Sequence, residues 1–123
     1  MTDPNFILLY VANPIASAEF YSRLLGKPAQ EVSPTFAMFG LDTGVMLGLW
    51  AAHTVAPAPD HGSARGELAF TVAGVDEVHA RFRDWSEAGL MIAQEPTRMD
   101  FGTTFVACDP DGHRLRVFAP GSP

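Results

Sequence analysis

The segment Phe6-Ile7-Leu8-Leu9-Tyr10-Val11-Ala12 is matched further along the chain by Glu67-Leu68-Ala69-Phe70-Thr71-Val72-Ala73. Each run leads into a stretch in which apolar residues recur at helical spacing. Each half then contains an acidic turn with glycine before an apolar strand, at residues 41–44 and at residues 109–112. The chain therefore predicts two copies of one module, and the repeat supplies pairs of equivalent positions that can be compared.

The first half predicts a strand, a helix and three further strands. Residues 6–12 are short, apolar and bounded by prolines, which favours a buried strand. Asn13 can cap, and Pro14 can open, a helix that runs to about Leu25 and ends at Gly26. The three further strands are expected at residues 29–32, 36–41 and 45–52.

The second half predicts the same order of elements after a linker. Residues 53–65 are rich in proline, glycine and alanine, which indicates the linker. A helix is expected from Val75 to about Ala88, and strands at residues 66–73, 91–98, 103–108 and 113–118. The predicted fold class is α+β, one domain over residues 1–123. Its βαβββ modules, residues 1–52 and 66–123, form curved mixed sheets that pair around a cleft.

The composition describes a small acidic protein. The formal charge is −6 and the pI is about 5.0, without any cluster of Lys and Arg, which argues against nucleic-acid binding. Cys108 is the single cysteine, so an intrachain disulfide is impossible, and it is expected to be a buried, inert thiol. Residues 1–5 carry no basic residue, and residues 45–52 are far shorter than the ~18 residues of a membrane span. We therefore expect a soluble cytoplasmic protein.

Two segments resemble signatures of the vicinal oxygen chelate superfamily, which includes glyoxalase I, extradiol dioxygenases and bleomycin-resistance proteins. Residues 18–26, AEFYSRLLG, resemble its first helix, and residues 109–115, DPDGHRL, resemble its closing hairpin. Residues 33–36, SPTF, together with residues 47–50, LGLW, are most similar to phenazine-type antibiotic-resistance binding proteins. The resemblance implies a homodimer in which two chains exchange modules and form two equivalent clefts.

The resemblance also implies where metal-dependent relatives place their ligands: at Phe6 and Gly48 in one module, and at Glu67 and Arg116 in the other. The repeat supports these pairs, because Phe6 aligns with Glu67 and Gly48 with Arg116. First-row metals take imidazole or carboxylate donors, and only Glu67 offers one. A register shift by one residue would substitute residues that do not ligate either: Ile7, Leu47, Leu49, Leu115 and Val117. We expect no bound metal and no cofactor.

Glu67 and Arg116 allow three interpretations. They could form an ion pair where the metal would have been, or they could be two unrelated charges at the rim of the cleft. Alternatively, the planar guanidinium of Arg116 could bind a ligand carboxylate. The four histidines lack metal-like spacing and are expected to be solvated or locally bonded, with closure over the pocket as the alternative for the two in the linker: His53, His61, His79 and His113.

The other candidate binding residues are aromatic and lie on or beside strands predicted to line the cleft: Phe36, Phe39, Trp50, Phe101 and Phe105. Gly48 and Trp50 share one face of a strand, so a flat ring could lie over the glycine and stack on the indole. Phe36 or Phe39 would add a second wall, depending on which of them faces inward. The alternative is a packing role, which is expected for Phe82 and Trp85 on the second helix.

The sequence favours a non-enzymatic protein, without catalytic residues, that sequesters a planar aromatic antibiotic or pigment. Neither a Ser-His-Asp order nor a glycine-rich phosphate loop is present. The alternative is a metal-dependent lyase, dioxygenase or thiol transferase of the same fold, with metal ligands at other positions. A purely structural member without a small-molecule role is a further alternative.

Overall fold

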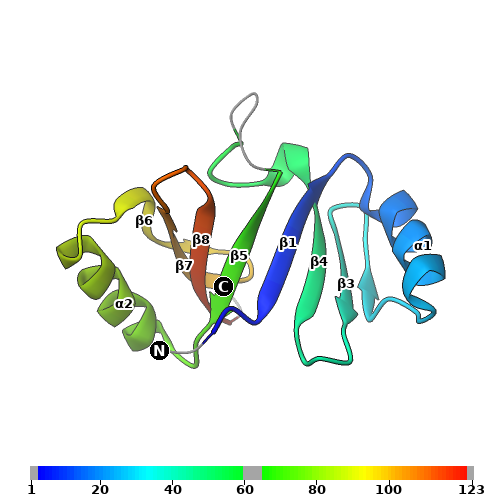
Figure 1. The fold of residues 1–123 in the computed structure, drawn as a ribbon, viewed down its shortest axis with the longest axis horizontal. Helices are drawn as coiled ribbons and strands as arrows, with labels where there is room; N and C mark the ends of the chain where they lie inside the picture. Colours follow the sequence, from blue (N-terminus) through cyan, green and yellow to red (C-terminus); the bar gives the residue numbers. More distant parts are fainter. Residues whose placement is uncertain (1–2, 60–64, 122–123) are drawn as a thin grey trace. The chain divides into compact units, whose positions relative to one another are not determined.

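The computed structural model describes residues 3–59 and 65–121. The chain divides into two compact units, of which one is Asn5–Gly66 and the other is Glu67–Pro123 together with Met1–Pro4. Each unit contains one helix and four strands among its described residues, so the chain is α+β, as predicted (Figure 1). None of the described helices has the length and hydropathy needed to cross a membrane.

The first module contains β1 (Phe6–Val11), α1 (Pro14–Leu25), β2 (Glu31–Val32), β3 (Phe36–Gly40) and β4 (Met46–Ala51), followed by a short 3-10 turn at Ala52–Thr54. Its strands lie in the order β2-β3-β4-β1. The β1–β4 pair is parallel and the other two pairs are antiparallel, which makes a mixed sheet.

The ends of α1 are set by local chemistry. The side-chain oxygen of Asn13 accepts hydrogen bonds from the backbone N–H of Ile15 at 3.1 Å and of Ala16 at 3.2 Å, which caps the first turn. Gly26 ends the helix in the left-handed conformation, at φ 70°, and its N–H donates to the carbonyl of Ser22. The start and end predicted from Asn13-Pro14 and Gly26 are therefore confirmed.

The second module repeats this topology with β5 (Gly66–Thr71), α2 (Val75–Glu87), β6 (Met91–Met99), β7 (Gly102–Cys108) and β8 (Arg114–Pro120). The strand order is β5-β8-β7-β6, with β5 and β8 parallel and the other pairs antiparallel. In each module the helix covers one face of its sheet (Figure 1).

Each core lies between a helix and its own sheet. In the first module, Ala18 of α1 packs with strand residues that include Phe39 and Leu49. In the second, the Trp85 ring of α2 packs edge-to-face against Phe70 and Phe105, with centroids 5.6 and 5.5 Å apart. Trp85 is therefore a core residue, as predicted.

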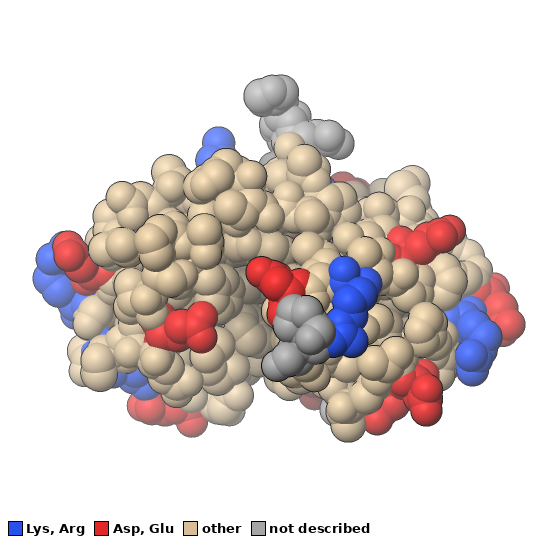
Figure 2. Space-filling view, turned by 180° about the vertical axis from the view of Figure 1, so that it is seen from behind, with Lys and Arg blue, Asp and Glu red and all other residues tan. Residues whose placement is uncertain are grey.

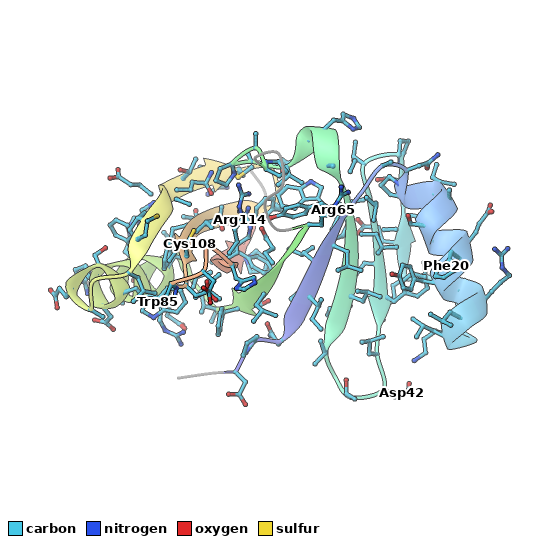
Figure 3. All side chains as sticks on the ribbon, turned by 45° about the horizontal axis from the view of Figure 1, so that its top comes forward. Phe20, Asp42, Arg65, Trp85, Cys108 and Arg114 are labelled. Atoms are coloured by element: carbon cyan, nitrogen blue, oxygen red, sulfur yellow. The ribbon has the colours of Figure 1, made fainter. Side chains whose placement is uncertain are left out.

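The predicted apolar face of α1 is only partly buried. Their spacing of four residues predicts that Phe20 and Leu24 share an apolar face of the helix. They are instead 54% and 66% exposed (Figure 3). The reason is geometric: successive residues turn by about 100° around a helix, so Phe20 lies about 200° away from the buried Ala18. These two side chains consequently point away from the sheet.

The turn between β7 and β8 is held by one carboxylate. Asp109 Oδ1 accepts hydrogen bonds from the N–H of His113 at 2.8 Å and of Asp111 at 2.9 Å, and Oδ2 lies 2.8 Å from His113 Nδ1. The backbone hydrogen bond from His113 is the largest cause that lowers the pKa of Asp109 below its usual value of 3.8. The ionised form is therefore the one that stabilises the folded turn.

This arrangement predicts a pH-dependent loss of stability in Asp109→Ala. A carboxylate whose folded-state pKa is lowered stabilises the protein above its unfolded-state pKa, and that stabilisation disappears as the pH falls through the folded-state pKa. Thermal unfolding at pH 7 should show a lower Tm for the variant, and the difference should shrink as the pH falls below 3.8. A Tm difference that stays constant from pH 7 to pH 2 would contradict this role.

Candidate functional site

The sheet of the first module has one face turned away from α1, and its side chains stand in register across the strands. Phe36 lies opposite Trp50, and Trp50 lies opposite Tyr10. The next row runs from Met38 through Gly48 to Leu8, and the third from Gly40 through Met46 to Phe6. We call this surface the aromatic face; it comprises Phe6, Leu8, Tyr10, Phe36, Met38, Gly40, Met46, Gly48 and Trp50.

The aromatic face offers accessible rings and thioethers. Trp50, Phe36 and Met38 are each partly exposed, whereas Tyr10 is buried. The rings of Tyr10 and Trp50 meet edge-to-face, with centroids 6.3 Å apart and an interplanar angle of 83°. This contact orients the indole at the sheet surface while part of it stays open to solvent.

The space beside Gly48 is filled by protein side chains. A Cβ at this position would lie 2.5 Å from Leu8 Cδ2, 2.8 Å from Phe6 Cε1 and 2.9 Å from Phe36 Cζ. The glycine thus lets two aromatic rings approach the strand closely, and the gap expected for a ligand is taken by those rings. A ligand on this face would rest on Phe6 and Phe36 rather than on the glycine backbone.

The two phenylalanines left open by the sequence lie on opposite faces of the first sheet. Phe36 belongs to the aromatic face, and Phe39 is fully buried in the core beneath α1. Phe105 is likewise fully buried, in the core beneath α2. The prediction that Phe39 and Phe105 line the binding site is therefore corrected: both side chains pack beneath a helix and have no exposed surface that a ligand could contact.

Six members of the aromatic face were not predicted as binding residues: Phe6, Leu8, Tyr10, Met38, Gly40 and Met46. Phe6 had been considered only as a metal position. A usable signal was present, since residues two apart on a strand share a face. Applying that alternation to Phe36 and Trp50 gives Met38 and Met46, but only once the pairing of β3 with β4 is known.

In the second module, Glu67 and Arg116 form a buried ion pair. Arg116 Nε donates to Glu67 Oε1 at 2.5 Å, and Nη2 lies 3.4 Å from Oε2. The two side chains are 1% and 0% exposed, for Arg116 and Glu67 respectively. Arg116 Nη1 also donates to the hydroxyl of Thr104 at 3.3 Å, and that hydroxyl donates to the carbonyl of Val117 at 2.9 Å. The ion-pair interpretation is confirmed, and the interpretation as exposed rim charges is wrong.

The strand registers support the equivalence of positions inferred from the repeat. In the first module Phe6 pairs with Met46, two residues before Gly48. In the second, Glu67 pairs with Arg114, two residues before Arg116. Phe6 and Gly48 thus occupy the same places in their sheet as Glu67 and Arg116 occupy in theirs.

Phe101 lies beside the buried arginine. Its ring centroid is 5.8 Å from Arg116 Cζ, within range of a cation–π contact. The same ring meets Phe118 edge-to-face, with centroids 5.9 Å apart. Phe101 is partly exposed and therefore remains a candidate binding residue, whereas Arg116 is covered.

The residues at the four metal-equivalent positions do not fit a divalent metal. Phe6 and Gly48 have no donor atom in their side chains, and the Glu67 carboxylate is engaged by Arg116. Within residues 3–59 and 65–121, no group of three or more His, Cys, Asp or Glu side chains is placed to hold a metal ion. A metal-dependent step cannot be derived from these donors.

The described histidines and the cysteine are not among the strand positions that form the aromatic face. His113 binds Asp109, His53 lies in the exposed turn after β4, and His79 is exposed on α2. His61 falls outside the described residues. Cys108 is partly exposed, not buried as expected, because it is the last residue of β7, where it lies opposite Arg114 of β8 (Figure 3).

Basic side chains do not gather into a patch on the face shown in Figure 2, where they lie scattered among acidic ones. An open depression of about 540 Å³ lies on the helix side of the first module, between α1 and β2. It is lined by residues such as Ile15, Ala18 and Val32, and none of the predicted site residues borders it.

Comparisons with known proteins assign the family. Residues 4–117 match the Glyoxalase/Bleomycin resistance protein/Dioxygenase superfamily, and the chain belongs to this superfamily, as predicted. The chain is 29% identical, over 119 residues, to the phenazine antibiotic resistance protein EhpR of Enterobacter agglomerans, with 93% of this chain and 89% of that protein covered.

Two solved structures extend the comparison. A structure described as the NAD-dependent benzaldehyde dehydrogenase from Legionella pneumophila is 47% identical, with a TM-score of 0.89, and the match covers 96% of this chain and 100% of that one. A glyoxalase/bleomycin resistance protein/dioxygenase superfamily member from Vibrio splendidus is 19% identical, with a TM-score of 0.59 and coverage of 94% and 97%. The second likeness supports the fold alone.

Proposed function

We propose that the protein is a non-enzymatic, metal-free binder that sequesters a planar aromatic small molecule in a resistance-type role. The observation that carries the proposal is the pairing of Phe36 with Trp50 on the partly exposed aromatic face. The 29% identity to a phenazine antibiotic resistance protein, over nearly all of the chain, supports the same class of ligand.

The chemistry of the aromatic face suits a flat, polarizable ligand. Stacking on aromatic rings contributes about 0.5–1.5 kcal/mol beyond the area buried. The thioethers of Met38 and Met46, in the rows next to Trp50, add adaptable contacts with aromatic rings. The ligand-bearing surface in this proposal is therefore made by Phe6, Phe36, Met38, Met46 and Trp50.

A metal-dependent lyase, dioxygenase or thiol transferase is less well supported. Each of these needs a set of ligands with an open position for substrate. The described residues do not supply such a set, because the one carboxylate at the family's metal positions, Glu67, is held by Arg116.

The name of the Legionella protein raises a nicotinamide-dependent dehydrogenase as another candidate. Dinucleotide phosphates bind at helix N-termini with free N–H groups, after a glycine-rich turn. In α1, Pro14 has no N–H and the Asn13 side chain occupies those of Ile15 and Ala16. The first turn of α2 carries Asp76 and Glu77, which would repel a diphosphate. The N-termini of α1 and α2 therefore do not fit this cofactor.

We expect Trp50→Ala to weaken binding of phenazine by about tenfold or more, which corresponds to about 1.4 kcal/mol. The Kd of the wild type is measured by titrating the intrinsic tryptophan fluorescence with phenazine. Calorimetry gives the Kd of both proteins, because Trp50→Ala lacks the fluorophore that reports binding. Trp85 is buried in the core of the second module, so a Trp85→Phe variant isolates the response of Trp50.

Phe20→Ala is the matched control for the loss of an exposed aromatic side chain, because Phe20 points away from the sheet on α1. Its Kd should equal that of the wild type. Failure of every planar aromatic probe to bind below millimolar concentration, or equal affinity of wild type and Trp50→Ala, would overturn the proposal.

The homodimer with exchanged modules stays a prediction.

A further inference from the structure

One edge of the aromatic face is acidic. Glu31 on β2 pairs with Met38 on β3, so its side chain stands on the same face, at the end of the row that continues through Gly48. Glu31 is exposed, and no described residue forms an ion pair with it. A ligand that rests on Met38 and Phe36 would therefore meet a free carboxylate at this edge.

An amide lies next to that carboxylate. A Cβ at Gly40 would overlap the Nε2 atom of Gln30, and it would lie 3.8 Å from the sulfur of Met46. The Gln30 side chain thus lies across the sheet at Gly40, on the aromatic face. Its backbone is fixed by an N–H hydrogen bond to the carbonyl of Met38 at 2.7 Å. Glycine at position 40 is what allows the amide to occupy this place.

Lys27, which reaches β3 from the end of α1, has its charge already paired. Lys27 is engaged through its Nζ by the Asp42 carboxylate at 2.7 Å and by the Gly40 carbonyl at 3.3 Å. The backbone of Arg65 lies beside Tyr10 on β1, three strands away from β2. Three strand spacings amount to about 14 Å for the backbone. Arg23 of α1 borders the depression on the helix side of β2, so Glu31 is the charged side chain that β2 itself presents on the aromatic face.

The repeat places a second acceptor at the equivalent position. In the second module the row through Arg116 runs to Val106 and then to Gln94 on the edge strand β6. Oε1 of Gln94 is buried and accepts no hydrogen bond from a described residue. The row through Gly48 ends at the Glu31 carboxylate, and the row through Arg116 ends at the Gln94 amide oxygen, so each module has an acceptor without a partner among the described residues. A buried acceptor without a partner, such as Gln94 Oε1, is uncommon in proteins.

We infer that the aromatic face selects planar aromatic ligands that carry a hydrogen-bond donor, such as an amino group, on the edge turned toward β2, and that Glu31 accepts from this donor with Gln30 beside it. The inference rests on the proposed function. The strands β2 and β4 lie about 10 Å apart, comparable to the length of a three-ring system, so one ligand can reach Glu31 while it stacks near Trp50. A carboxylate at the same edge would be repelled by Glu31.

The test compares three probes with one ring system: phenazine, 2,3-diaminophenazine and phenazine-1-carboxylate. Calorimetric titration of the wild type should give the tightest Kd for the diamino compound and the weakest for the carboxylate. Glu31→Gln should weaken the diamino compound by about 3- to 10-fold and strengthen the carboxylate, while leaving unsubstituted phenazine unchanged. Gln30→Leu, which keeps the size of the side chain and removes its amide, should reduce the preference for the diamino compound.

Glu19→Gln is the matched control, because it removes the same charge from the exposed surface of α1 and should change none of the three constants. Absence of binding by all three probes would refute the proposed function itself. Binding of all three with equal Kd, or tightest binding of the carboxylate, would overturn the present inference and leave the proposed function standing. If Glu31→Gln and Glu19→Gln change the three Kd values equally, the change comes from the net charge of the protein, and the proposed role of Glu31 is overturned.

Discussion

Glu67→Leu is expected to lower the free energy of unfolding by about 3–5 kcal/mol, the largest effect we expect from a substitution outside the two cores. The reason is that the variant leaves the Arg116 guanidinium buried without its carboxylate. Arg116 is 1% exposed, and neither the Thr104 hydroxyl nor the Phe101 ring beside it can neutralise a full charge. Arg116→Met should lower the free energy of unfolding by a similar amount, because it removes the guanidinium that pairs with the buried Glu67 carboxylate.

The double variant Glu67→Leu/Arg116→Met is expected to recover most of this loss. Replacing a buried ion pair by apolar side chains of similar volume is often neutral or stabilising, because the cost of removing two charges from water disappears. Urea unfolding of the four proteins gives the coupling free energy directly. Losses that simply add in the double variant would show that the pair is not the source of the effect.

The exposed ion pair between Lys27 and Asp42 is the natural comparison, because Asp42 lies in the β3–β4 turn and its side chain is almost fully exposed (Figure 3). Hydrogen bonding to Lys27 is the largest cause that lowers the pKa of Asp42, but solvent screens such surface pairs strongly. Asp42→Ala should therefore change the stability far less than Glu67→Leu does. Comparing the stability losses of Asp42→Ala and Glu67→Leu shows how much of the loss in Glu67→Leu comes from leaving a charge buried and how much from losing an ion pair.

The ion pair also bears on how the family's metal positions are used in this chain. A cation is already present at the position equivalent to Gly48, in the form of the Arg116 guanidinium, and Glu67 satisfies it from the neighbouring strand. The first module has apolar residues at both equivalent places, with the Phe6 ring lying against Gly48. The Arg116 charge is thus paired with a carboxylate of its own module.

Much of the fold could be predicted because the signals that set it are local. Asn13, Pro14 and Gly26 fix the ends of α1 through hydrogen bonds within a few residues, and those ends were predicted correctly. The acidic turn at Asp109 is equally local. The repeat then carried the topology of one module over to the other. The family's metal positions brought Glu67 and Arg116 together as candidates, with an ion pair as one of three interpretations, and the contact itself decided among them.

The face on which each aromatic residue lies could not be predicted from local signals. Residues 36–41 are apolar on both faces, so alternation alone does not say which face meets the helix. The pairing of β3 with β4 and the position of α1 decide that Phe39 is core and Phe36 is not. The same lack of long-range information explains why Phe20 was assigned to the buried side of α1.

Phe105→Ala and Phe36→Ala form the second test, in which the same change is made on opposite faces of equivalent sheets. Phe105 is fully buried and packs against Trp85 and Phe82, with ring centroids 5.5 Å away in both cases. Its truncation opens a cavity in the core of the second module, and we expect a loss of about 3–5 kcal/mol in the free energy of unfolding. Phe36 is partly exposed, so its truncation should cost much less.

Binding should respond in the opposite order. Phe36 lies opposite Trp50 on the aromatic face and leans over Gly48, so Phe36→Ala removes part of the surface on which a planar ligand would rest. We expect Phe36→Ala to raise the Kd for phenazine by about three- to tenfold, on the basis of the energy of one aromatic contact. Phe105→Ala, measured at a temperature where it stays folded, should bind nearly as the wild type does. The opposite result would be a larger rise in Kd for Phe105→Ala than for Phe36→Ala. Binding would then depend on the stability of the fold and not on the Phe36 side chain, and the aromatic face would not be the binding surface.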